Sequence, residues 1–344
     1  MTGRLSHCPA CGDDAPTSVE SVHGFDVVRC AHCGLEYTAN PHVDLQSYAD
    51  TYSGKAGFLD DPTIYAAPAA RLSLERDAFI RPAPYLTPGE QWVLQQITSA
   101  VPRSATVLDV GCGTGRILTA FRRNGYRAIG VDPVEHVVLN LRRQGHDVRV
   151  GSMPGLDWNA PPPDVVTLFE VLEHLPDPGP VLREIRHRFP RARVGVTVPS
   201  PTRVSLRHGR AGADYPPNHF LRWTRTALEH AFSRAGFRQV TVIAPHPSGT
   251  ELTPGAATLI PLSLLRSLAR RRARPLGANK DRATIAAMSE QPSAPTVARR
   301  LMATGLLVSH RAWRTIANVA GAPSAAIAAR QGWSSASLAV WAEP

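Results

Sequence analysis

The sequence contains no hydrophobic run long enough to cross a membrane. Its longest nearly apolar stretch, residues 256–265, covers about half of the length that a bilayer-spanning helix needs. The first residues also lack the apolar region of a signal peptide. With 43% hydrophobic and 19% charged residues, the chain of 344 residues has the composition of a globular protein. We therefore expect it to be cytoplasmic.

Cysteine is scarce, and four of the five cysteines form two Cys-x-x-Cys pairs. Cys8 and Cys11 make the first pair, and Cys30 and Cys33 make the second. Two such pairs at this separation match the pattern of a zinc ribbon, in which four thiolates bind one Zn²⁺. A redox pair or free thiols are the alternatives, but neither accounts for both pairs. We predict a structural Zn²⁺ that folds residues 1–40, a segment too short to build its own core.

Acidic residues are scarce in one part of the chain. Residues 246–336 hold twelve arginine and lysine residues but three acidic ones, so nearly all of the net charge of +10 belongs to this segment. Its patterns over 259–272 and 296–319 are typical of amphipathic basic helices. We expect a helical lid on the core, with contact to a membrane surface or an anionic substrate as the alternatives. Nucleic acid is not an expected partner, because the rest of the chain is close to neutral.

A glycine-rich turn lies between a predicted strand and a predicted helix. Residues 106–110 predict a short buried strand, residues 116–123 predict a helix, and between them lie Gly111, Gly113 and Gly115. Glycine lets the backbone turn with positive φ and leaves room for a ligand. The helix that follows presents free N–H groups to that ligand. A merely structural turn is the alternative.

An acidic residue follows at the distance expected for ribose recognition. Residues 127–132 predict a second apolar strand, which ends at Asp132, about 20 residues beyond the glycines. A carboxylate at this point accepts hydrogen bonds from the hydroxyls of a ribose. Nicotinamide-dependent dehydrogenases use the same arrangement, so these two features indicate only an adenosine-containing cofactor.

Three blocks of sequence are more specific. Leu-Asp-Val-Gly-Cys-Gly-Thr-Gly over 108–115, Gly-Val-Asp over 130–132 and the block 164–177 resemble, in this order, the class I S-adenosylmethionine-dependent methyltransferases. The resemblance covers residues 88–245. It implies a Rossmann-like α/β fold with a seven-stranded, mostly parallel sheet, whose antiparallel last strand we place at 337–344. It also implies S-adenosylmethionine as the cofactor.

The resemblance further implies which residues hold this cofactor. They lie in the glycine turn and at the ends of the neighbouring strands, and comprise Asp109, Gly111, Cys112, Gly113, Gly115, Asp132, Pro133, Ser152, Met153 and Glu170. Family members often carry an aspartate where Ser152 stands, so the hydroxyl or the backbone of Ser152 is left to contact the adenine. Met153 either packs on the adenine or belongs to the core.

Four residues are candidates for the catalytic machinery. Glu170 follows the fourth predicted strand, at the edge where open α/β sheets bind ligands, and Glu173 and His174 lie in the loop beyond it. His219 belongs to the segment 217–224, which resembles a His-x-x-x-Trp-Thr segment of the family near the active-site mouth. Each histidine is either the base that removes a proton from the acceptor or a structural residue.

The predicted organisation has five parts. These are the zinc ribbon 1–40, a connecting segment 41–87, the cofactor-binding core 88–245, the basic helical insertion 246–336 and the last strand 337–344. Some zinc-ribbon methyltransferases of sugars and other small molecules carry a similar cysteine module and a tyrosine-rich bridge. Tyr48 and Tyr52 stand in this bridge and either pack the ribbon onto the core or line the substrate mouth.

The resemblance implies in-line transfer of a methyl group to a small-molecule acceptor. We expect a hydroxyl oxygen as the methylated atom, with carbon or nitrogen as alternatives. An RNA methyltransferase and a non-catalytic cofactor-binding protein are the rival hypotheses. The sequence lacks the Asn/Asp-Pro-Pro-Tyr type of motif that base-amine methylation uses after the fourth strand, and its excess charge lies in the late insertion. Both features favour the small-molecule acceptor.

Overall fold

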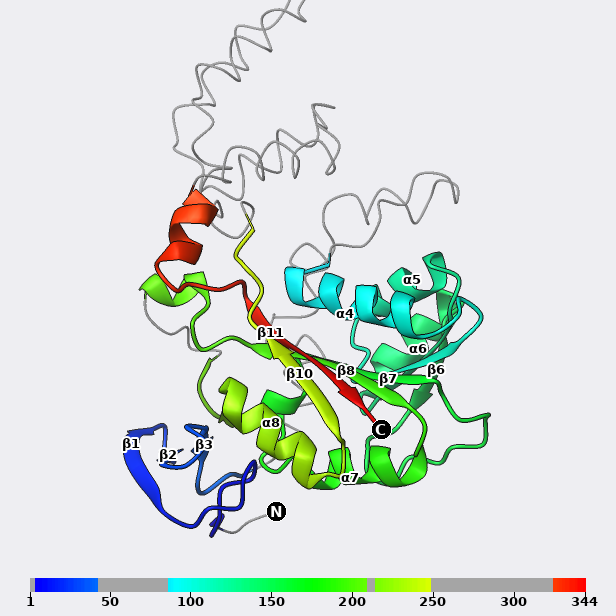
Figure 1. The fold of residues 1–344 in the computed structure, drawn as a ribbon. Coiled ribbons are helices and arrows are strands. Elements are labelled where there is room, and N and C mark those ends of the chain that lie inside the picture. The colour runs from blue at the N-terminus through cyan, green and yellow to red at the C-terminus, as the bar shows by residue number, and fades with distance from the viewer. Residues whose placement is uncertain (1–3, 43–85, 209–213, 249–323) are drawn as a thin grey trace, which may run out of the picture. The chain divides into compact units, whose positions relative to one another are not determined.

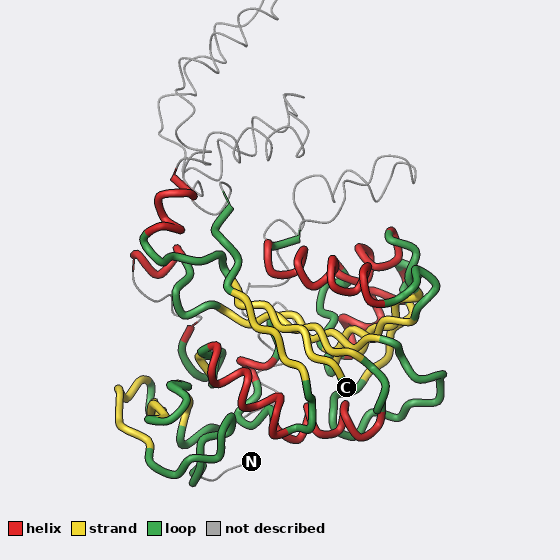
Figure 2. The backbone as a smooth tube through the Cα atoms, viewed as in Figure 1, coloured by secondary structure: helices red, strands yellow, loops and turns green. Residues whose placement is uncertain are grey.

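The computed structural model describes residues 4–42, 86–208, 214–248 and 324–344 (Figure 1; Figure 2). Its centre is a seven-stranded sheet in the order β10-β11-β8-β7-β4-β5-β6. The strands are β4 (Thr106–Val110), β5 (Arg127–Asp132), β6 (Asp147–Val150), β7 (Val165–Phe169), β8 (Arg193–Pro199), β10 (Gln239–Ile243) and β11 (Ser337–Glu343). β8, β7, β4, β5 and β6 run parallel, as expected for apolar strands that are buried on both faces. The predicted Rossmann-like fold is confirmed.

The last strand runs antiparallel, also as predicted. β11 pairs with β10 on one side and with β8 on the other, and both pairings are antiparallel. Its residues 337–342 are all buried, because neighbouring strands flank it on both sides. The chain between β10 and β11 therefore leaves and re-enters the sheet at adjacent strands.

Helices cover both faces of this sheet (Figure 1). On one face lie α4 (Pro88–Ala100), α5 (Arg116–Arg123) and α6 (Glu135–Arg143), and on the other α7 (Gly179–Arg188) and α8 (Arg225–Arg234). Apolar residues at helical spacing make the contact, for example Val93 and Ile97 of α4, which are fully buried. The three layers leave the carboxyl ends of the parallel strands at one edge, where the predicted site residues stand.

A second, smaller sheet joins the N-terminal segment to the core. It contains β1 (Pro16–Val22), β2 (Phe25–Cys30), β3 (Glu36–Thr38) and β9 (Leu221–Arg222), in this order. β9 comes from the core, and it pairs antiparallel with β3. This strand is not predicted from the sequence, where the ribbon is expected to be a separate part. The pairing continues past the strands, since the Thr38 N–H donates to the Phe220 carbonyl at 2.9 Å.

Several expectations fall outside the described residues. These are the positions of Tyr48 and Tyr52 and the amphipathic helices over 259–272 and 296–319. Of the segment 246–336, the structure describes its first residues and residues 324–336, in which 324–330 are helical. In the described ranges, no helix is both long and apolar enough to pass through a bilayer.

The contact between α4 and the sheet leads to a stability prediction. A Cβ atom on Gly195 of β8 would lie 2.5 Å from Val93 Cγ1 of α4, so Gly195→Ala should force the helix away from the sheet. We expect unfolding free energy to fall by about 1–3 kcal/mol, the usual cost of overpacking. Urea unfolding measures the change. In the background of Val93→Ala, which removes the crowding methyl group, Gly195→Ala should cost much less stability, and an equal cost in the two backgrounds would contradict this explanation.

Candidate functional site

The three glycines of the predicted turn follow β4 and take positive φ angles of 72°, 48° and 72° at Gly111, Gly113 and Gly115. A Cβ atom on Gly111 would lie 2.7 Å from Val171 Cγ2, and one on Gly115 would lie 2.5 Å from Leu141 Cδ2. Both positions therefore require glycine. At Gly113 a Cβ atom would meet no atom closer than 4.0 Å, which leaves room for a ligand beside the backbone.

Asp132 ends β5 and is hydrogen-bonded to the glycine turn. Its Oδ2 accepts from the Gly113 N–H at 2.9 Å, and its Oδ1 accepts from the Val134 N–H at 3.0 Å. Burial raises the pKa of this carboxyl, and the two backbone donors oppose the shift. The carboxylate is held beside the turn with lone pairs left over for the hydroxyls of a ribose.

Two other predicted cofactor residues lie packed beneath the turn. Cys112 is 6% exposed and lies against Gly130, where a Cβ atom would come within 2.7 Å of its Sγ. Burial raises the pKa of its thiol, so Cys112 stays protonated and is no nucleophile. Asp109 is 2% exposed and accepts a hydrogen bond from Thr167 Oγ1 at 2.7 Å. Both residues support the turn, and their part in cofactor binding stays a prediction.

The remaining predicted cofactor residues differ in exposure. Ser152 and Pro133 are exposed and follow β6 and β5, at the same edge of the sheet as the glycine turn. Met153 is buried and belongs to the apolar core. Of the two alternatives for Met153, the structure therefore favours the core.

Glu170 directly follows β7 and takes a φ of 54°, a conformation that side chains avoid. Its N–H donates to the Thr197 carbonyl at 2.9 Å, and its Oε1 accepts from Ser337 Oγ at 2.7 Å. Contacts with β8 and β11 thus hold a turn whose conformation costs about 1–3 kcal/mol. Burial raises the pKa of the Glu170 carboxyl to about 6. Strain of this kind at a strand end is typical of functional sites.

Glu173, His174 and His219 come together next to Glu170. The ring centroids of the two histidines are 4.8 Å apart, and Glu173 Oε1 lies 3.9 Å from His174 Nε2. His174 Nδ1 lies 2.7 Å from the Asn218 carbonyl oxygen. Because that oxygen can only accept, Nδ1 carries the proton and Nε2 offers a lone pair. The three side chains present ligand atoms within 4.8 Å of one another, a separation that also suits a metal ion.

Burial decides the protonation of this cluster. Both Glu173 oxygens are buried and lack a hydrogen-bond partner among the described residues, and burial together with the charge of Glu170 raises the pKa of Glu173 well above its usual range. Burial lowers the pKa of His174, and lowers that of His219 to about 3. At neutral pH the cluster therefore consists of a protonated carboxyl and two neutral imidazoles.

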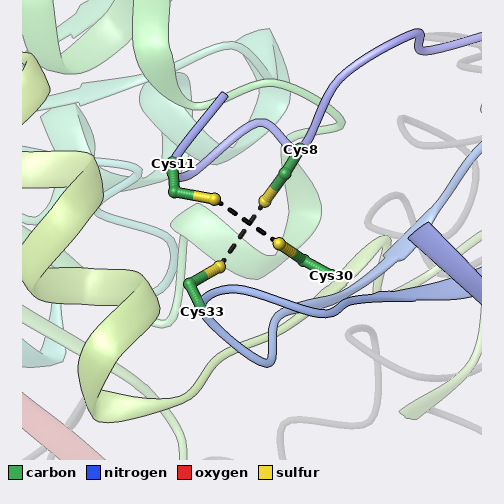
Figure 3. Close-up of side chains that lie close together, drawn as sticks. All are labelled: Cys8, Cys11, Cys30 and Cys33. Carbon is green, nitrogen blue, oxygen red and sulfur yellow. Dashed lines mark hydrogen bonds between the residues drawn. The ribbon is translucent and has the colours of Figure 1, made fainter. Parts of the chain in front are cut away.

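The four predicted zinc ligands form a compact cluster (Figure 3). Cys8 Sγ and Cys33 Sγ are 3.6 Å apart, Cys11 Sγ and Cys30 Sγ are 3.4 Å apart, and all four sulfurs lie within 4.8 Å of one another. Tetrahedral Zn²⁺ with Zn–S bonds of about 2.3 Å places its sulfurs about 3.8 Å apart, so these side chains fit the ion.

Comparison with known proteins agrees with this geometry. Residues 90–242 match the family model of a methyltransferase domain. A ubiquinone biosynthesis O-methyltransferase of Xylella fastidiosa is 31% identical over 131 residues, which are 36% of this chain and 53% of that protein. One from Aeromonas salmonicida is 36% identical over 86 residues, 23% of this chain and 36% of that protein. The chain thus spans about half, or less, of the length of these curated relatives.

A solved structure of a SAM dependent methyltransferase from Archaeoglobus fulgidus is also similar, with a TM-score of 0.42 and 16% identity over 74% of this chain and 94% of that one. The sheet order, the glycine turn and Asp132 define the Rossmann-like cofactor-binding class of α/β proteins. Within that class, residues 90–242 form a methyltransferase domain, and the resemblance to the class I S-adenosylmethionine-dependent methyltransferases is confirmed for this part of the chain.

The residues that surround His219 are not predicted from the sequence. Asp214 Oδ1 lies 3.8 Å from His219 Nδ1 and also pairs with Arg203, and Arg222 donates to Glu36 Oε2 at 2.8 Å. No spacing rule links these positions, since Glu36 belongs to the ribbon and Arg203 to a loop after β8. Arg222 lies inside the predicted segment 217–224, and this position is the one sequence feature that points to it.

Zinc content tests the cysteine cluster. We expect one zinc ion per purified chain, and Cys33→Ser should lose most of it because three thiolates no longer complete the tetrahedral shell. Inductively coupled plasma mass spectrometry gives the ratio. Cys112→Ser, which changes the cysteine of the glycine turn, serves as the control and should keep its zinc. Equal zinc content in the two variants would contradict the assignment.

The buried Asp109 leads to a pH prediction. Burial, opposed by the Thr167 hydrogen bond, raises its pKa from 3.8 to about 7. A raised folded-state pKa gives stability that is present below about pH 4 and is lost as the pH rises through about 7. Asp109→Asn should therefore match the wild type in acid and gain on the order of 1–4 kcal/mol relative to it by pH 8. Urea unfolding across this pH range measures the difference in unfolding free energy between variant and wild type. Asp147→Asn, at an exposed position, is the control. A difference for Asp109→Asn that does not change with pH would refute the prediction.

Proposed function

We propose that this protein transfers a methyl group from S-adenosylmethionine to a hydroxyl oxygen of a small-molecule acceptor. The observation that carries the proposal is the Asp132 carboxylate bonded to the Gly113 N–H, at the same sheet edge as Glu170 and the cluster of Glu173, His174 and His219. This arrangement pairs a ribose-binding corner with groups able to receive a proton. The relatives support oxygen as the target, since they are named O-methyltransferases.

The chemistry requires alignment more than acid or base strength. The cofactor supplies an electrophilic methyl group and a neutral thioether leaving group, so its C–S bond breaks as the new C–O bond forms. The glycine turn and Asp132 hold the ribose end, which sets the line along which the acceptor oxygen must approach. The turn after β7, which the strained Glu170 holds in place, positions the acceptor.

The acceptor hydroxyl must lose its proton during the transfer. His219 and His174 are neutral at physiological pH and can receive it, whereas the protonated Glu173 cannot. The His174 Nε2 lone pair faces Glu173, and the His174 ring packs edge-to-face on His219. We therefore assign His219 as the residue that receives the proton of the acceptor hydroxyl, and His174 as the residue that positions the His219 ring.

We further propose that the four cysteines hold a structural Zn²⁺. Four thiolates complete a tetrahedral shell and leave no position for a substrate or water, so the ion takes no part in methyl transfer. Its role is to fold the segment that carries β1 to β3.

Cofactor binding tests the central assignment. Asp132→Asn should weaken the binding of S-adenosylhomocysteine at least about tenfold, or about 1.4 kcal/mol, because the amide is a weaker acceptor for ribose hydroxyls. Isothermal titration calorimetry on the zinc-loaded chain measures the affinity, and Asp147→Asn, an exposed aspartate at the start of β6, is the matched control. Unchanged affinity in Asp132→Asn with an intact thermal transition would reject the role of Asp132.

The transfer itself is tested by incubating the chain with S-adenosylmethionine and a panel of small hydroxylated compounds. Mass spectrometry should detect S-adenosylhomocysteine together with a methyl ether. A product methylated at carbon or nitrogen would overturn the oxygen assignment while leaving the methyltransferase assignment in place.

A further inference from the structure

A cavity of about 300 Å³ lies between the ribbon sheet and the core. Arg29, Gly34 and Glu36 of the ribbon line it on one side, and Pro199 and His219 of the core line it on the other. Pro199 ends β8, so the cavity opens at the carboxyl edge of the parallel sheet, where such folds bind their ligands.

The wall between ribbon and core is fixed by hydrogen bonds. β3 pairs with β9, and Thr224 Oγ1 donates to the Cys33 carbonyl at 2.6 Å. On the other side of the same segment, the Phe220 N–H donates to the Glu173 carbonyl at 2.8 Å. The segment that carries His219 is therefore held between the cysteine cluster and the end of β7, and His219 contributes to the cavity from this segment.

Two of the three arginines that line the cavity already serve internal partners. Arg203 pairs with Asp214, and Arg222 donates to Glu36 and Glu20 at 2.8 and 3.3 Å. Both arginine side chains are 15% exposed, and their ion pairs stabilise the wall of the cavity.

Arg29 differs from these two. Its side chain is 54% exposed, and the structure records one partner for it among the described residues, Glu36 at 2.5 Å. An arginine has five N–H donors in a planar fork that matches a carboxylate or a phosphate. The three guanidinium groups of the lining face the carboxylates of Glu36 and Asp214 and, from outside the lining, that of Glu20.

Trp223 supplies a second, independent observation. It lines the same cavity and is fully buried, yet its indole N–H has no hydrogen-bond partner among the residues that the structure describes. A buried donor without a partner is destabilising, because it has lost its hydrogen bonds to water. A polar ligand in the cavity can relieve this cost by accepting from the indole.

We propose that this cavity is the acceptor site and that it selects acceptors with a carboxylate or phosphate group, which Arg29 of the ribbon binds while the acceptor hydroxyl meets His219. The inference rests on the proposed methyl transfer and adds to it the substrate class and a role for the ribbon in specificity. Burial is the main cause of the low pKa of His219, and the charges of Arg203 and Arg222 add to it. A bound anion offsets these two charges and makes His219 a better proton acceptor.

The test uses the full zinc-loaded chain saturated with S-adenosylhomocysteine. The probes are 4-hydroxyphenylacetate, its neutral counterpart 4-hydroxyphenylacetamide, and phenyl phosphate, with affinities measured by calorimetry. We expect at least one of the two anionic probes to bind at least tenfold more tightly than the amide. Which of the two binds more tightly distinguishes a carboxylate site from a phosphate site. Two-dimensional NMR should show the Trp223 indole signal, assigned through Trp223→Phe, shifting as the acid binds.

Arg29→Ala should reduce the affinity for the acid at least tenfold and leave that for S-adenosylhomocysteine within twofold. Arg4→Ala is the matched control, because Arg4 is also an exposed ribbon arginine with one aspartate partner, Asp26 at 2.7 Å. Equal binding of acid and amide, equal binding by Arg29→Ala and wild type, or no acid binding tighter than about 1 mM would each overturn the inference. Failure of S-adenosylhomocysteine itself to bind would instead reject the proposed function.

Discussion

The hydrogen bond from the Gly113 N–H to the Asp132 carboxylate is the contact on which the predicted cofactor corner depends. It exists because β4 and β5 are parallel neighbours, so that the turn after one strand meets the last residue of the other. The same geometry brings the ends of β7 and β8 to this edge, and with them Glu170 and the wall of the acceptor cavity. One constraint of the backbone therefore collects residues from four separate parts of the chain.

Desolvation then sets the chemistry at that edge. Glu170 and Glu173 are carboxyls in an apolar setting, and their pKa values rise, while those of His174 and His219 fall. The carboxyl of Glu173 and the two imidazoles are therefore uncharged near physiological pH, so the cluster of Glu173, His174 and His219 is neutral. A neutral imidazole suits a reaction in which the protein must only receive a proton.

The ribbon lies next to His219 because its strand β3 pairs with β9 of the core in the four-stranded sheet. The sequence predicts the zinc ligands and the segment 217–224 separately, and the structure joins the two through the contacts of Thr38 with Phe220 and of Cys33 with Thr224. The ribbon, whose sequence predicts only a zinc-dependent folding unit, therefore contributes Arg29 and Glu36 to a cavity that His219 also lines.

The sequence alone determined the features that depend on local spacing: the paired cysteines, the glycine turn before a helix, the acid at the end of the second strand, and the strands whose apolar runs predict a parallel sheet. It did not determine β9, the partners of His219 or the burial that neutralises Glu173. These depend on contacts between residues far apart in the chain, such as Glu36 and Arg222. Periodicity and spacing depend on neighbours along the chain, whereas burial and charge pairing arise when the layers pack, so these features are set by the folded structure.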